Sequence, residues 1–149
     1  NATASDFETG GLAERLPQQA ARVGLPLDRL WVELTEEEPP QEIGRLSEAM
    51  AALRAAGVRI AVDDFGTGFS SLGWILRLPL DGVKLDASFT NALGLKAGLA
   101  VARAVAGMGA ELGLSLTAEG VQSDQQGAAL RALGYHYGQG AHFGMPRPA

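Results

Sequence analysis

The chain has 149 residues with a formal net charge of −5, and 46% of its residues are hydrophobic, which is ordinary for one folded domain. It contains no cysteine, which excludes disulfides and thiolate zinc sites. The acidic charge, without a cluster of lysine or arginine, argues against a nucleic-acid polymer as ligand. No apolar run reaches the ~20 residues that cross a bilayer, and no secretory leader is visible, so a cytoplasmic location is expected.

One pattern repeats along the chain: a short apolar run ends in a polar residue, and an amphipathic stretch follows. The opening residues resemble the end of a strand, and further strands are predicted at 30–36, 58–64, 83–86, 114–119 and 135–140. Apolar residues at three- and four-residue spacings predict helices between these strands. The predicted helices cover 7–23, 41–56, 97–112 and 123–133. Gly57, Gly113 and Gly134 are expected to end three of them, and Ser123 to cap the last.

Strands that alternate with helices predict the α/β class with a parallel sheet. Successive strand ends are spaced close to the ~30 residues of one βα unit. A complete (β/α) barrel needs about eight such units, whereas this chain shows about six. We therefore expect a partial (β/α) barrel in a single domain over residues 1–149, with an open doubly wound sheet as the alternative.

The polar residues that end the predicted strands would share one place in either fold. Active sites of parallel α/β proteins lie at the carboxyl ends of the strands. The carboxylates expected at this edge are Glu33, Asp63, Asp64, Asp86 and Glu119. Unpaired carboxylates repel one another, and hard divalent cations such as Mg²⁺ or Mn²⁺ relieve that repulsion.

The chemistry that follows is metal-dependent attack on a phosphate diester. Two divalent ions ~4 Å apart would activate water and bind the diester, and Lys84 would hold the hydroxide or a phosphate oxygen. Taken singly, however, each acidic residue is better explained as a solvated turn residue or a helix cap, and the metal site rests on the agreement of several strand ends. The run at 66–71 would offer backbone amides to a phosphate, but it lacks the Rossmann and Walker spacings. His136 and His142 lack a partner at metal-ligand spacing and are expected to be ordinary loop or strand-edge residues.

Several motifs together are familiar. They are ELTE at 33–36, DDFGTGFSSL at 63–72, LPLDGVKLD at 78–86, AEGV at 118–121 and QG at 139–140. In order and spacing these motifs resemble the EAL-domain family, the bacterial phosphodiesterases for cyclic di-GMP. The resemblance covers nearly the whole chain. It implies a modified (β/α) barrel that, as a complete domain, hydrolyses cyclic di-GMP to linear pGpG. In this chain alone we expect the activity to be impaired or lost.

The resemblance also implies roles for individual residues. The implied ligands of a two-metal Mg²⁺ or Mn²⁺ site are Asn1, Glu33, Asp63 and Asp64. The implied catalytic residues are Lys84 near the attacking water, Glu119 as support for water or metal and as general base, and Gln139. The implied substrate and loop residues are Glu36, Phe65, Gly66, Thr67, Gly68, Ser70 and Asp86. In the family, Glu36 and the loop at 65–71 would couple substrate binding to dimerisation.

Two departures from the family pattern leave alternatives open. The Glu-Ala-Leu signature is absent, as if the chain began after it, and with it go the first strands and one glutamate ligand. Gln122 stands where the family usually has a second glutamate after AEGV. A second hypothesis is therefore a degenerate receptor that binds cyclic di-GMP without cleaving it. A third is a truncated chain that is marginal, oligomeric or aggregating because its strand edges are open.

The family resemblance also implies an assembly. A homodimer is one expectation, and fusion to sensory or GGDEF-type domains in a longer protein is another. A membrane segment and a nucleic-acid partner are not expected in this chain.

Overall fold

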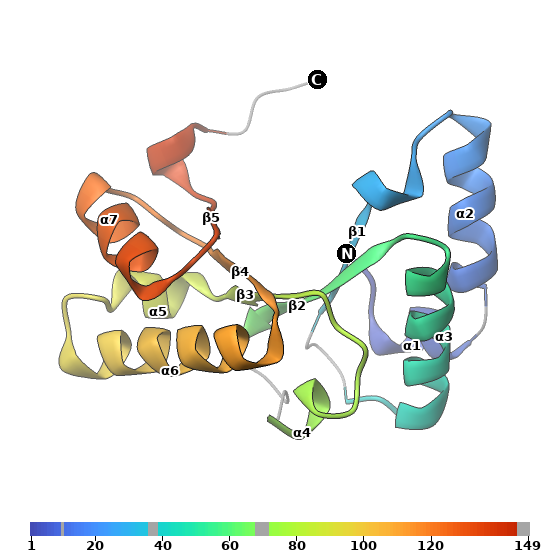
Figure 1. Cartoon of the computed structure of the whole chain (residues 1–149), viewed down its shortest axis with the longest axis horizontal. Coiled ribbons are helices and arrows are strands. Elements are labelled where there is room, and N and C mark those ends of the chain that lie inside the picture. Colours follow the sequence, from blue (N-terminus) through green and yellow to red (C-terminus); the bar gives the residue numbers. More distant parts are fainter. Residues whose placement is uncertain (10, 36–38, 68–71, 146–149) are drawn as a thin grey trace. The chain divides into compact units, whose positions relative to one another are not determined.

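The computed structural model describes residues 1–9, 11–35, 39–67 and 72–145 (Figure 1). Contacts divide the chain into two units, and each is described by itself. The first unit comprises Asn1–Asp63 and Thr67–Asp81, and the second comprises Asp64–Gly66 and Gly82–Ala149. None of the helices in the described ranges is both long and apolar enough to span a membrane.

The first unit contains two paired strands and a group of helices. In chain order its elements are α1 (Ala4–Glu8), α2 (Leu12–Arg22), the short 3₁₀ helix η1 (Leu27–Arg29), β1 (Trp31–Leu34), α3 (Ile43–Ala55), β2 (Arg59–Phe65) and α4 (Leu72–Ile75). Strands β1 and β2 pair in parallel, with Glu33 opposite Ala61. Ala2 forms a parallel bridge with Leu34, which confirms the strand-like character of the opening residues. The last residues of β2 belong to the second unit.

The second unit alternates strands and helices. Its elements are β3 (Gly82–Leu85), α5 (Ala87–Asn91), α6 (Lys96–Leu112), β4 (Ser115–Ala118), α7 (Asp124–Leu133), β5 (Tyr137–Gly138) and the 3₁₀ helix η2 (Ala141–Phe143). Strand β4 pairs in parallel with β3 on one side and with β5 on the other. Helix α6 packs against β3, β4, α5 and α7 (yellow to red in Figure 1).

Apolar side chains at the predicted spacings fill each unit. In α3, Leu46, Met50 and Leu53 recur on one helix face and are all fully buried. In the second unit, Leu85 of β3 and Leu116 of β4 are at most 1% exposed to solvent. The parallel pairing of strands that alternate with helices confirms the predicted α/β class.

The helix predicted over 7–23 is wrong in its extent, because the structure has two helices there. Helix α1 starts early, at Ala4, because Thr3 and Asp6 form a reciprocal capping box. It ends at Glu8, and Gly11, with φ of 148°, stands immediately before α2. The apolar spacing continued across this break, so the sequence pattern concealed it. The strand predicted over 135–140 is also shorter, since only Tyr137 and Gly138 pair with β4.

The end of β5 approaches another turn very closely. The Val121 N–H donates to the Gln139 carbonyl at 3.0 Å, and the His142 N–H donates to the Val121 carbonyl at 3.0 Å. A Cβ atom on Gly140 would collide with the backbone N and O of Val121. Glycine at 140 is thus required by backbone contact, and the turns after β4 and β5 are joined directly.

Candidate functional site

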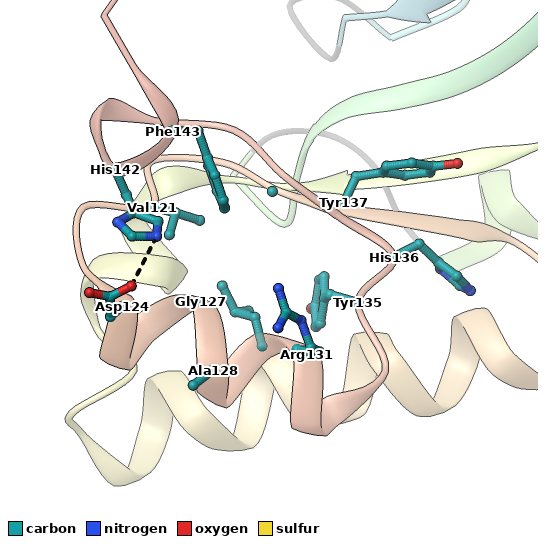
Figure 2. A pocket seen from close by; sticks show the side chains of 12 residues that line it. Val121, Asp124, Gly127, Ala128, Arg131, Tyr135, His136, Tyr137, His142 and Phe143 are labelled. Atoms are coloured by element: carbon teal, nitrogen blue, oxygen red, sulfur yellow. Dashed lines mark ion pairs between the residues drawn. The ribbon is translucent and has the colours of Figure 1, made fainter.

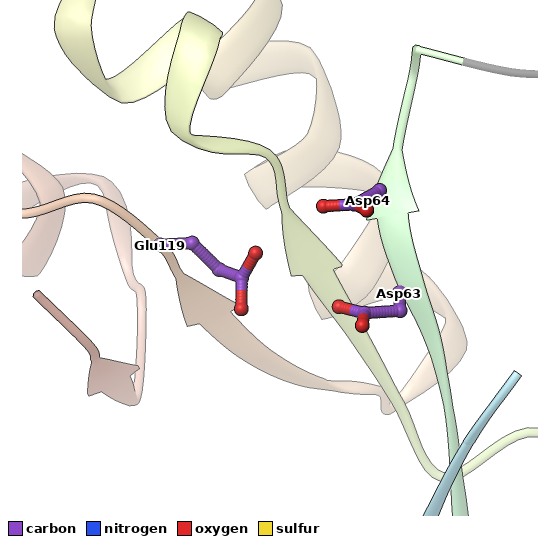
Figure 3. A group of neighbouring side chains, drawn as sticks. All are labelled: Asp63, Asp64 and Glu119. Carbon is purple, nitrogen blue, oxygen red and sulfur yellow. The ribbon is translucent and has the colours of Figure 1, made fainter. Parts of the chain in front are cut away.

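Three carboxylates gather at the end of β2 (Figure 3). Asp63, Asp64 and Glu119 each place an oxygen within 4.8 Å of the other two. Asp63 is buried, Asp64 is exposed and Glu119 is intermediate. Asp63 is the last residue of the first segment of the first unit and is bonded to Asp64, while Glu119 directly follows β4. Carboxylate oxygens at this separation suit a hard divalent cation, which takes oxygen ligands at ~2.0–2.6 Å.

The backbone at Asp64 explains how two consecutive residues join one group. Asp64 has φ of 49°, and among the described residues it is the one residue other than glycine with positive φ. Consecutive side chains of a regular strand point to opposite faces. The left-handed conformation at Asp64 ends that alternation, so its carboxylate turns toward Glu119 (Figure 3). Aspartate tolerates this conformation better than most residues do.

Lys84 and Glu119 form an enclosed ion pair. Lys84 Nζ lies 2.7 Å from Glu119 Oε1, and the two side chains are 8% and 16% exposed. Lys84 lies opposite Thr117 in the β3–β4 register, so Lys84 and Glu119 share one face of the sheet. The Glu119 N–H donates to the Leu85 carbonyl at 3.0 Å, which extends the strand pairing up to the acid. The strand register therefore brings a cation and an acid together.

Asp86 begins α5 as its N-cap. Its Oδ1 accepts hydrogen bonds from the Ser88 N–H at 2.9 Å and from the Ser88 hydroxyl. Burial alone would raise the pKa of Asp86, but the hydrogen bonds from the Ser88 hydroxyl and from the Ser88 and Ala87 N–H groups outweigh burial and hold the pKa below its usual value. Asp86 is thus a fixed anion at the start of α5.

Three of the predicted metal ligands share a face within the first unit. The Ala2–Leu34 bridge places Asn1 beside Glu33 in register. Glu33 is opposite Ala61, and Asp63 follows two residues after Ala61 on the same face. Asn1 is exposed and Glu33 is half-buried. The register thus aligns Asn1, Glu33 and Asp63.

Gln139 is brought close to Glu119 in register. Its N–H donates to the Ala118 carbonyl at 2.8 Å, and the β4–β5 pairing places it opposite Glu119. Gln139 itself is exposed. Gln122 is also exposed. It lines a surface hollow together with Leu93, Gly94 and Gln126.

The loop residues divide into described and undescribed positions. Phe65 is buried, Gly66 has φ of 101°, and Thr67 is exposed. The predicted loop residues Glu36, Gly68 and Ser70 lie outside the described residues.

A pocket of about 280 Å³ lies between α7 and the β5–η2 segment (Figure 2). The Arg131 and Phe143 side chains extend into it, and His142 Nε2 lies 3.5 Å from Asp124 Oδ1 at its rim. Among the residues that the structure describes, none of the predicted site residues lines this pocket. Sequence reasoning missed it, because its lining combines side chains without a motif. His136 is a strand-edge residue as expected, and its Nδ1 accepts the Leu116 N–H at 3.1 Å.

Comparison with known proteins adds independent information. The family model described as "EAL domain" matches residues 1–146. The cyclic di-GMP phosphodiesterase PA2567 of Pseudomonas aeruginosa is 35% identical over 98% of this chain, which spans 25% of that protein.

Solved structures agree with the sequence comparison. The PaMucR phosphodiesterase in complex with c-di-GMP superposes with a TM-score of 0.89 at 35% identity, over 100% of this chain and 61% of that one. The manganese and cyclic di-GMP complex of Klebsiella pneumoniae BlrP1 at pH 6 gives a TM-score of 0.82 at 27% identity, over 93% of this chain and 36% of that one. The chain thus spans a quarter of PA2567 and under two thirds of these two solved chains.

Proposed function

Because this chain belongs to the EAL domain family, we propose that it carries the metal-binding and catalytic edge of a phosphodiesterase that hydrolyses cyclic di-GMP to linear pGpG. The observation that carries the proposal is the enclosed Lys84–Glu119 pair beside the carboxylates of Asp63 and Asp64. We propose that the chain is the C-terminal part of an EAL domain. Its homodimer and its fusion to sensory or GGDEF-type domains remain predictions from the family, and its cytoplasmic location remains a prediction from the sequence.

The donor set fits Mg²⁺ or Mn²⁺. Its described members supply oxygen atoms, and three carboxylates approach within 4.8 Å. We propose that Asn1, Glu33, Asp63 and Asp64 would hold the metal ions. When bound, such ions would polarise a phosphate oxygen and lower the pKa of a water molecule.

The proposed roles of the protein's own residues follow from charge and burial. Glu119 would accept the proton of the attacking water, since its carboxylate is only partly exposed and adjoins the acids. Lys84 would hold Glu119 in place and attract the negative phosphate diester. Gln139 would donate an amide hydrogen bond to the substrate, and Asp86 with the Phe65–Thr67 turn would shape the approach to it.

A hydrolysis assay on the 149-residue chain tests the proposal. The chain is incubated with cyclic di-GMP and Mg²⁺, then Mn²⁺, and pGpG is measured by chromatography. Product that disappears with EDTA and in Asp63→Asn would support the proposal, and we expect its yield from this chain alone to be low. Asp124→Asn is the matched control, because Asp124 is a fully exposed acid on α7. Equal turnover by wild type and Asp63→Asn would refute the assignment.

The same preparation separates hydrolysis from binding alone. Calorimetry that shows cyclic di-GMP binding without product would assign a receptor, the alternative that Gln122 suggests. If neither binding nor product is found, both functions are wrong for this chain.

A further inference from the structure

The side chain of Gln126 bridges two segments of the second unit. Its Oε1 accepts a hydrogen bond from the Gln122 N–H at 2.7 Å, and its Nε2 donates to the Thr90 carbonyl at 3.2 Å. Gln122 lies in the turn after β4, in which Glu119 is the first residue, and Thr90 belongs to α5. One amide group therefore ties the turn that carries Glu119 to the neighbouring helix.

The bridge requires an amide group at this position. A backbone donor approaches the side chain on one side, and a backbone acceptor approaches it on the other. A carboxylate has no hydrogen to donate to the Thr90 carbonyl, and an apolar side chain can form neither bond. Gln126 is half-buried, so the two hydrogen bonds are partly shielded from water.

Gln126 does more than start its own helix. It is the third residue of α7, and its N–H donates to the hydroxyl of the N-cap residue Ser123 at 3.3 Å. In a capping box, the side chain of this third residue returns to the N–H of the N-cap itself. Here the side chain instead reaches the N–H of Gln122, one residue before the cap, and continues to α5.

The turn after β4 also contacts α5 and the turn after β5. Gly120 has φ of 65°, and a Cβ atom there would lie 2.5 Å from the Ala87 Cβ. The next residue, Val121, donates its N–H to the Gln139 carbonyl at 3.0 Å. The position of the turn after β4 relative to α5 therefore also determines where Gln139 lies.

We propose that Gln126 is a positioning residue, whose amide holds the turn after β4 against α5 and, through Val121, holds Gln139 in place. The inference rests on the proposed function for the use of Glu119 and Gln139 in hydrolysis. The bridge itself is a property of the metal-free chain and is testable separately.

The first experiment measures the bridge without metal or activity. Amide hydrogen exchange of the metal-free chain is followed by NMR for wild type, Gln126→Met and the control Gln125→Met. Gln125 is an exposed neighbour on the same helix turn. We expect the Gln122 amide to exchange on the order of tenfold faster in Gln126→Met, because its acceptor is gone, and the Val121 amide to follow. Unchanged protection of both amides in a folded Gln126→Met would overturn the proposal.

The variant Gln126→Glu separates the bridge from the start of α7 and keeps the test decisive if Gln126→Met unfolds. A glutamate in the first turn favours the helix, and its carboxylate still accepts the Gln122 N–H. It cannot donate to the Thr90 carbonyl. We expect the α7 amides to stay protected while the Val121 amide exchanges faster than in the control Gln125→Glu. Val121 protection equal to that of the control would refute the proposal.

The third measurement connects the bridge to catalysis. In the hydrolysis assay, kcat should fall roughly tenfold in Gln126→Glu, as one lost hydrogen bond allows, and stay at the wild-type value in Gln125→Glu. KM should change little, because Gln126 is not proposed to touch the substrate. Equal kcat values for the two variants would overturn the positioning role. A wild type without turnover refutes the proposed function, while the exchange rates still decide the role of Gln126.

Discussion

Lys84 Nζ and Glu119 Oε1 are 2.7 Å apart inside the second unit, where both side chains are largely withdrawn from water. An enclosed ion pair differs from a surface pair in one important respect. Removing one partner leaves a desolvated charge without compensation. The pair therefore contributes to the stability of the fold as well as to the proposed chemistry. Variants of either residue need a stability measurement beside the activity assay.

Lys84→Met should destabilise the metal-free chain by about 3 kcal/mol, because it removes the cation of an enclosed ion pair with Glu119. Urea unfolding followed by circular dichroism measures this free energy. The control is Arg45→Met, which breaks the Arg45–Glu42 pair at 2.8 Å, whose side chains are 66% and 60% exposed. That change should cost at most about 1 kcal/mol. Equal losses in the two variants would show that enclosure does not matter here.

Asp64→Asn should stabilise the metal-free chain while weakening Mn²⁺ binding. Asparagine adopts positive φ readily and removes one of the clustered charges. We expect Tm in EDTA to rise by about 2 °C or more, the shift that ~0.5–1 kcal/mol produces at this size. Calorimetry then follows Mn²⁺ binding. A Tm below wild type would contradict the expected relief of repulsion.

Asp86 should contribute to the loss of stability in acid. Its pKa in the folded chain is below its ordinary value of 3.8, so the folded state binds this proton less readily than the unfolded state does. Its stabilising contribution is therefore present above pH ~4 and disappears as pH falls through the folded pKa. In EDTA, the free-energy difference between wild type and Asp86→Asn should be constant near neutrality and shrink below pH ~4. A difference independent of pH would exclude this linkage.

Tyr135 should make the chain sensitive to alkali. Its hydroxyl donates to the Ala102 carbonyl at 3.1 Å in a buried position, and burial raises the pKa of Tyr135 above its ordinary value of 10.0. The neutral form is favoured by folding, so stability is fully present below pH ~10 and is lost as pH rises further. Tyr135→Phe should cost about 1 kcal/mol at neutral pH and reduce the alkaline loss. Unfolding curves at several pH values measure both effects.

Long periodic elements were predictable from sequence, and short ones were not. The helix expected over 97–112 is α6, and Gly113 ends it with φ of 67°. Ser123 caps α7 as expected, by accepting the Gln126 N–H. Helix α5 was missed because its 5 residues show no apolar period, and an Asp86 cap and packing onto two glycines define it instead.

The acidic residues of the candidate site were predictable from the sequence, but the local structure that positions them was not. The strand-end rule identified Asp63 and Glu119, which the structure brings together with Asp64. Residue types do not reveal that Asp64 is left-handed, since aspartate is only enriched in that region. Nor do they reveal that Ser88 donates hydrogen bonds to Asp86, because that contact depends on where α5 begins. Such features depend on tertiary contacts that a sequence pattern does not contain.

The contact between Gly140 and the Val121 backbone determines where the chain tolerates insertions. The turn after β4 carries Glu119 and the turn after β5 carries Gln139, and this contact locks them together. Inserting one residue into either turn would shift both Glu119 and Gln139 from their present alignment. Gly134, by contrast, ends α7 in an exposed position with nothing within 4 Å of its would-be Cβ. A fluorescent probe or affinity tag belongs at that helix end.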